Sequence, residues 1–162
     1  MRHDQRGFSL IELLIVVAII LIIAAIAIPN FLRSRIAANQ ASAIESIRVI
    51  STAEVTYSTT FNSGFSQTLD DLGPPATGQP TSSTAAGLVD ETLAAGYKSG
   101  YSFLYTPTTY NPALNSWNGY VLLANPSTYG QTGGVYYYQD QSFTIRANST
   151  TTASATDTSV GD

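Results

Sequence analysis

A long apolar segment near the start of the chain limits what it can fold into. Residues 8–28 read FSLIELLIVVAIILIIAAIAI, twenty-one positions with a single ionisable side chain, Glu12. At ~1.5 Å per residue, a helix of this length spans about 31 Å, close to the ~30 Å hydrocarbon core of a bilayer. A soluble helix that is apolar on every face would leave one side against water. The segment therefore predicts a transmembrane helix.

The carboxyl group of Glu12 is the unusual feature of this segment. A carboxylate inside the membrane costs on the order of 2.5–3.5 kcal/mol on insertion scales, and such a group usually has a partner. No Lys, Arg or His lies between Phe8 and Leu32, and the nearest cations are in the preceding MRHDQRG. One interpretation is that the Glu12 side chain only reaches to the membrane interface. The other is that Glu12 pairs with a cation from outside the segment.

The residues around Glu12 carry a family resemblance. The stretch RGFSLIELLIVVAIILIIAAIAIPNF resembles the amino-terminal signature of type IV prepilins with an N-methylated phenylalanine. In that family a membrane peptidase cuts after the leader glycine, here Gly7, and methylates the new terminal residue, here Phe8. The family's glutamate falls on Glu12 and its helix proline on Pro29. The resemblance implies a leader at residues 1–7.

Cleavage after Gly7 would supply the missing cation. It would place an ammonium group on Phe8, four residues before Glu12. The resemblance implies that this amine pairs with Glu12 of a neighbouring subunit and sets the register of assembly. Residues 8–29 would then be the transmembrane and polymerisation half of a longer helix.

Composition argues against several functions. At 162 residues the chain has room for one globular domain besides the apolar helix. Loss of residues 1–7 removes two of seven basic and one of eleven acidic residues, which leaves a net charge of −5 and disfavours nucleic acid as a partner. The chain has no cysteine, and its one histidine, His3, lies in the leader. We therefore expect no enzyme activity, catalytic residue, metal site or cofactor. We also expect the Lys98 side chain to be solvated.

Residues 30–60 predict an amphipathic continuation of the same helix, which we place from about Ser9 to about Thr59. The apolar side chains recur mostly every three or four positions and mark one face. They are Ile36, Ala43, Ile47, Ile50, Ala53, Tyr57 and Phe61. Glu45, Arg48 and Glu54 fall mainly on other faces. A coiled coil is the alternative, but the stripe is too short for several clean heptads.

Residues 61–100 form the least regular region and are expected to link helix to sheet. Residues 65–72 suggest a short helical turn, 78–87 an exposed loop and 88–95 another short helix. Four carboxylates could in principle bind calcium. They are Asp70, Asp71, Asp90 and Glu91. The regular spacing and glycine of a calcium loop are absent, so we interpret them as solvated charge.

Residues 101–147 alternate with period two and predict an antiparallel sheet of about four strands. The expected strands are Tyr101–Thr106, ended by Pro107, then Tyr120–Ala124, Val135–Gln139 and Phe143–Arg146. The apolar face of this sheet must be covered, and the apolar stripe on the long helix is expected to pack against it. The predicted fold is therefore α+β, a long amino-terminal helix packed against a carboxy-terminal antiparallel sheet, as in pilins.

Two carboxy-terminal features complete the sequence. Three successive tyrosines, Tyr136, Tyr137 and Tyr138, could offer a stacking platform for DNA, a glycan-binding face or a path for charge. A stacking platform needs basic residues beside the rings, and only Arg146 is near in sequence. A half-buried strand is therefore the favoured interpretation. Residues 148–162 are rich in Ser and Thr and are expected to form a flexible tail.

The resemblance implies a structural subunit of a type IV pilus filament. Its partners would be copies of itself, prepilin peptidase, the pilus assembly platform and, before assembly, the lipid bilayer. It would be a single-pass inner-membrane protein that later becomes part of an extracellular fibre. The alternatives are a minor pilin, a type II secretion pseudopilin, or a single-span anchored binding module.

Overall fold

The computed structural model describes residues 8–161. The chain divides into two compact units, residues 1–35 and residues 36–162, and one helix runs through both. This helix, α1, spans Leu10–Phe61 and contains Pro29. Its bounds lie within two residues of those predicted from the apolar run and the stripe.

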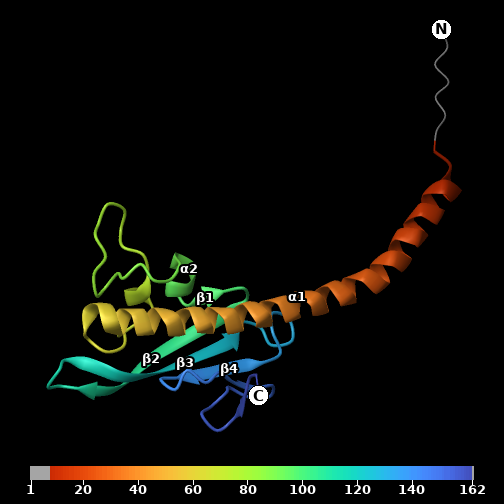
Figure 1. The fold of residues 1–162 in the computed structure, drawn as a ribbon. Helices are drawn as coiled ribbons and strands as arrows, with labels where there is room; N and C mark the ends of the chain where they lie inside the picture. Colours follow the sequence, from red (N-terminus) through yellow and green to blue (C-terminus); the bar gives the residue numbers. More distant parts are fainter. Residues whose placement is uncertain (1–7, 162) are drawn as a thin grey trace. The chain divides into compact units, whose positions relative to one another are not determined.

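The second unit contains a six-stranded, wholly antiparallel sheet in which every strand pairs with the next one along the chain. The strands are β1 (Tyr97–Lys98), β2 (Tyr101–Asn111), β3 (Ser116–Pro126), β4 (Tyr136–Asp140), β5 (Arg146–Asn148) and β6 (Thr158–Ser159). The carboxy-terminal half of α1 lies along this sheet (Figure 1). The α+β prediction is confirmed.

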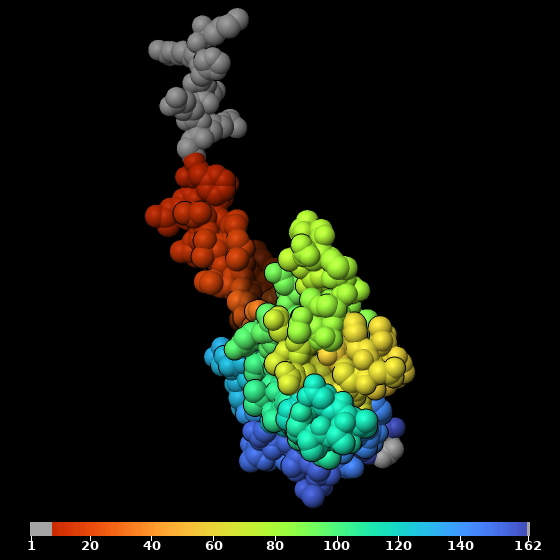
Figure 2. Space-filling model, turned by 90° about the vertical axis from the view of Figure 1, so that its left-hand side faces the viewer, coloured from red at the N-terminus to blue at the C-terminus, as the bar shows by residue number. Residues whose placement is uncertain are grey.

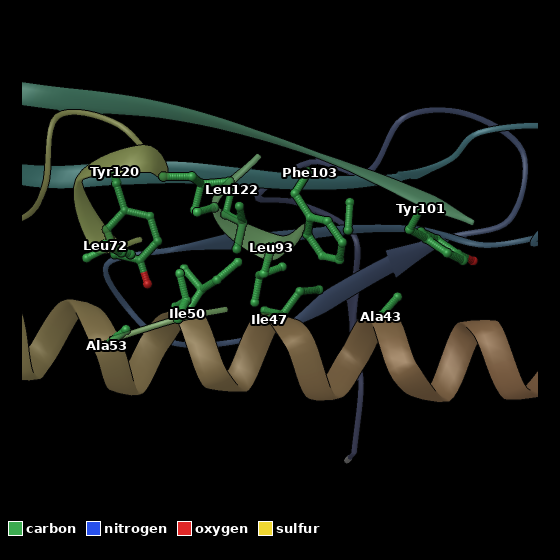
Figure 3. Packing of buried hydrophobic residues seen from close by; sticks show 14 of the residues in the cluster. Ala43, Ile47, Ile50, Ala53, Leu72, Leu93, Tyr101, Phe103, Tyr120 and Leu122 are labelled. Carbon is green, nitrogen blue, oxygen red and sulfur yellow. The ribbon is translucent and has the colours of Figure 1, made fainter. Parts of the chain in front are cut away.

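The apolar stripe on α1 forms the helix side of the core. Ala43, Ile47, Ile50, Ala53 and Tyr57 are all at most 5% exposed. In Figure 3 the labelled members of this stripe point toward the sheet. They meet Tyr101, Phe103, Tyr120 and Leu122 from the strands, and Leu72 and Leu93 from the linking region. Full burial of one such side chain is worth about 1.5–3 kcal/mol, so this stripe holds the helix on the sheet.

Two strand boundaries differ from the prediction. Strand β2 does not stop at Pro107, which pairs with Tyr120 inside the ladder. Strand β1 pairs only with the first two residues of β2, so Pro107 lies on a sheet edge where its missing N–H group is not needed. The expected strand at Phe143 is also wrong. Phe143 has φ 59°, and its N–H group closes a turn onto the Asp140 carbonyl at 2.9 Å, so β5 begins only at Arg146.

The carboxy-terminal segment is folded onto the sheet, which corrects the expectation of a flexible tail and adds β6 to the sheet. Residues 158 and 159 pair with β5, and the Val160 N–H group donates to the Ile145 carbonyl at 2.8 Å. Ala153 is 4% exposed. The Asp157 carboxylate accepts from the Ser154 N–H group at 2.7 Å and from the Asn148 side chain at 2.9 Å. Local hydrogen bonds therefore order a segment that has few apolar residues.

The linking region contains a 3₁₀ turn, η1 (Asp70–Leu72), and a one-turn helix, α2 (Glu91–Ala94). It begins beside the β2–β3 turn, where the Phe65 N–H group donates to the Trp117 carbonyl at 2.8 Å. Figure 2 shows the yellow end of α1, the lime loop and the teal β2–β3 turn gathered at one end of this unit. The linking region thus starts beside the β2–β3 turn, at the carboxy-terminal end of α1.

Candidate assembly site at the amino-terminal helix

The four predicted site residues fall at different places in the structure. Gly7 lies outside the described residues. Phe8 is the first described residue and is 75% exposed. Glu12 lies in the first turn of α1, and Pro29 is inside the same helix.

Glu12 forms a hydrogen bond within its own helix end. The Ser9 N–H group donates to Glu12 Oε2 at 2.9 Å, and the Ser9 carbonyl accepts from the N–H groups of Glu12 and Leu13 at 3.1 and 3.2 Å. This is one half of a capping box, in which an acid at the third helical position binds the N–H group of the cap residue. The negative charge is also favourable beside the positive end of the helix dipole.

The role of Ser9 was not predicted, although the sequence contains its signal. Ser-Leu-Ile-Glu over residues 9–12 has the spacing of a capping box directly before an apolar run. In the described part of the chain, the second carboxylate oxygen, Oε1, has no hydrogen-bond or ion-pair partner. Within residues 8–161, one oxygen of Glu12 is thus held by the helix and the other makes no contact of this kind.

The surface around Glu12 is apolar on every side. Seventeen large apolar side chains between Phe8 and Leu32 are at least 45% exposed, including Leu10 at 80%. Among the described residues, α1 is the one helix long and apolar enough to cross a membrane, and none of its most apolar window is buried. Such a surface is far larger than a soluble protein leaves open, so lipid or other apolar helices must cover it.

Pro29 alters the hydrogen bonding of α1 without ending it. Proline has no N–H group, so the Ala25 carbonyl, four residues earlier, lacks its usual helical donor. The helix nevertheless continues to Phe61. Pro29 thus marks a locally weakened point near the end of the apolar run.

The four acidic residues of the linking region were considered as calcium ligands from the sequence. Within residues 8–161, no group of three or more His, Cys, Asp or Glu side chains is placed to hold a metal ion. Asp71 accepts a hydrogen bond from the Thr68 N–H group at 2.9 Å. Asp90 caps α2 and pairs with Lys98, which was expected to be solvated.

The tyrosine run lies in β4, where Tyr137 and Tyr138 are buried and Tyr136 stacks on Tyr129 with ring centres 5.8 Å apart. An open groove nearby, of about 700 Å³, brings Arg48 to the same lining as Arg146. Both arginines lie near carboxylates, since Arg48 pairs with Glu45 at 3.5 Å and Arg146 interacts electrostatically with Asp140 and Asp157. The groove therefore has little uncompensated positive charge for a nucleic acid.

Comparison with known proteins finds one family motif and two curated relatives. The prokaryotic N-terminal methylation motif matches residues 2–28. The type IV major pilin protein PilA of Myxococcus xanthus is 50% identical over 53 residues, which are 33% of this chain and 24% of that protein. The type IV wide pilus major component PilA4 of Thermus thermophilus is 65% identical over 37 residues, 23% of this chain and 28% of that protein.

The chain thus spans about a quarter of the length of these curated relatives. No solved structure matches it. The matches confirm the resemblance to type IV prepilins, which the sequence carries in its first 28 residues.

Proposed function

From the amino-terminal signature of a type IV prepilin, which this chain carries, we propose that the protein is a non-enzymatic structural subunit of a type IV pilus filament. The observation that carries the proposal is the exposed apolar helix with one acid in its first turn. The names of the two relatives, a major pilin and a wide-pilus major component, support it.

Processing would complete the assembly site. Prepilin peptidase cuts after Gly7 and methylates Phe8, which leaves an ammonium group at the new terminus. Because Ser9 occupies Oε2 of Glu12, Oε1 remains to accept the Phe8 ammonium of a neighbouring subunit. A charge-assisted bond of this kind, formed where water is excluded, is stronger than its counterpart in water.

Assembly would exchange one apolar environment for another. Before assembly the residue 8–29 half of α1 sits in the inner membrane, where lipid covers its side chains. In the fibre, copies of the same helix cover one another. The sheet unit faces water, since its core is closed by residues 36–61 of α1. The assembly platform moves subunits from one state to the other, and the fibre lies outside the cell.

The test compares two glutamates of the same helix. Glu12→Gln removes the charge that would pair with the Phe8 ammonium, whereas Glu45→Gln removes an exposed charge with a 3.5 Å pair to Arg48. Both variants should enter the membrane and lose the leader. Electron microscopy of sheared surface material should show fibres built of Glu45→Gln protein and a loss of at least about 10-fold for Glu12→Gln.

Other outcomes would point to the alternatives. Normal fibres from Glu12→Gln would refute the pairing of Glu12 with the amine. Wild-type protein present only as a trace in fibres would indicate a minor pilin. Wild-type protein kept entirely in membranes would indicate a single-span anchor and would contradict the filament.

A further inference from the structure

Glu54 is a second acid in an unusual place, and the sequence pattern put it on the wrong face. It was expected outside the apolar stripe, but its exposure is 0%. Its neighbour in space is Ser66, at the start of the linking region and also fully buried. The Ser66 N–H group lies 2.9 Å from Glu54 Oε2, and Ser66 Oγ lies 2.6 Å from Glu54 Oε1.

The number of protons available in this network favours one protonation state of Glu54. Ser66 Oγ is also 3.0 Å from the Thr68 carbonyl, which can only accept. A serine hydroxyl has one proton, so it cannot fully serve both the Thr68 carbonyl and Glu54. If Glu54 is a neutral acid, its own proton goes to Ser66 Oγ and the serine proton goes to Thr68. Each hydrogen bond from Glu54 through Ser66 to Thr68 then has one donor and one acceptor.

The surroundings of Glu54 also disfavour a charge. The titratable groups that interact with it are Tyr57 on α1, Asp71 on η1, Tyr105 on β2 and Tyr120 on β3. None of these groups is a cation, and Asp71 is itself acidic. Burial raises the pKa of Glu54 above its ordinary value of 4.5. Hydrogen bonding to Ser66 and Tyr105 opposes the rise, and the nearby Asp71 adds to it.

The nearby Tyr105 hydroxyl is already engaged. It donates to the Ser66 carbonyl at 3.0 Å. An ionised Glu54 would therefore have to take a donor either from Ser66, at the expense of Thr68, or from Tyr105, at the expense of the Ser66 carbonyl. Each choice leaves a backbone carbonyl without its donor.

We propose that Glu54 is held as a neutral carboxylic acid that donates to Ser66, and that its ionisation at raised pH releases the start of the linking region from α1. The network lies wholly within residues 54–105 of the second unit, so it does not depend on filament assembly. The Glu54 proton thus connects α1 to Ser66, at the start of the linking region.

The sign of the pH effect follows from the raised pKa. The folded protein keeps the Glu54 proton at pH values where the unfolded chain has lost it. The stabilisation is therefore fully present below pH 4.5 and is lost as pH rises through the pKa of the folded state. Raised pH should weaken the fold at this point.

The first test observes the proton directly in the full-length protein in detergent micelles. The chain has four glutamates, Glu12, Glu45, Glu54 and Glu91. Replacing the other three with Gln leaves Glu54 as the sole glutamate, which can carry a ¹³C carboxyl label. The infrared spectrum should still contain the labelled C=O stretch of a protonated acid at pH values above 4.5, the ordinary pKa, and this stretch should disappear at high pH. A labelled C=O stretch that is lost with a midpoint at or below pH 4.5 would overturn the proposal.

The second test uses a neutral isostere. In Glu54→Gln the amide NH₂ group can donate to Ser66 Oγ and the amide oxygen can accept from the Ser66 N–H group. Between about pH 5 and pH 9, the unfolding midpoint of the wild type should fall by at least about 2–4 °C more than that of Glu54→Gln. Glu45→Gln, with an exposed acid, should follow the wild type. If the unfolding midpoints of the wild type and Glu54→Gln fall by the same amount over this pH range, the proposal is contradicted.

Discussion

Gly133 lies directly against the ring of Tyr101, so close that a Cβ atom on Gly133 would overlap the tyrosine hydroxyl. Tyr101 cannot move away easily. It is fully buried, and its hydroxyl donates to the Val135 carbonyl at 2.8 Å. The glycine-rich link between β3 and β4 is thus shaped to fit a residue of β2.

This contact predicts a difference between two adjacent glycines. Gly133→Ala should destabilise the fold by about 1–3 kcal/mol, because the new methyl group forces Tyr101 or the link to shift. Gly134→Ala is the matched control, since its Cβ atom would lie 3.7 Å from the Gln40 side chain, an ordinary contact. Thermal unfolding of the two purified variants in detergent compares them. Equal destabilisation by the two would contradict the close packing at Tyr101.

The helix stripe predicts a second pair of variants. Ile50 is fully buried between α1 and the sheet, while the adjacent Val49 is 37% exposed. Ile50→Ala should cost about 2–5 kcal/mol, because it removes buried methyl groups and leaves a cavity. Val49→Ala should stay within about 0.5 kcal/mol. Denaturant unfolding measures both, and a similar cost for each would mean that the helix does not pack through this stripe.

The Asp90–Lys98 pair predicts a shift in titration. The hydrogen bond from Lys98 is the main cause that holds the pKa of Asp90 at about 2, below its ordinary 3.8. The hydrogen bond from Thr92 adds to this effect. Because the folded pKa is lowered, the pair contributes stability above pH 3.8 that is lost as pH falls toward about 2. Both side chains are more than one-third exposed, so this contribution should not exceed about 1 kcal/mol.

Lys98→Met should therefore raise the pKa of Asp90 toward 3.8, as followed by NMR of the carboxyl carbon. The same spectra contain an internal control. The pKa of Asp157 is lowered by the Ser154 N–H group and should not change. If the pKa of Asp90 is the same in the variant as in the wild type, the lysine does not determine that pKa.

The ordered tail predicts a role for a single acid, Asp157. Asp157→Ala removes the acceptor of the Ser154 and Asn148 hydrogen bonds and should free residues 154–161 from β5. Limited proteolysis should then cut the tail faster than in the wild type. Asp70→Ala is the control, because the Asp70 side chain makes no hydrogen bond within the described residues. A tail as resistant in Asp157→Ala as in the wild type would mean that other contacts order it.

The sequence predicts best where many residues share one periodic pattern. The stripe from Ala43 to Tyr57 repeats over about four turns, so the helix and its buried face follow from spacing alone. Elements of two residues, such as β1 and β6, have no period to detect. They form because a neighbouring strand offers unpaired backbone groups, which is a property of the assembled sheet.

Glu54 shows where periodicity fails. It follows Ala53 in α1, so it lies at the flank of the stripe, where burial depends on what else covers the helix. The cover is the Ser66 segment, whose path is determined by tertiary contacts with β2 and β3. At the other end of α1, the Ser9–Glu12 cap could have been predicted from the sequence, because the capping-box spacing is local.

We propose that this chain becomes a structural subunit of a fibre after cleavage before Phe8. The most direct measurement is the intact mass and amino-terminal residue of the main protein in sheared surface fibres. We expect a chain that begins at Phe8, carries one methyl group on its amine and lacks residues 1–7. A main fibre component that still begins at Met1, or fibres that lack this protein, would contradict the account.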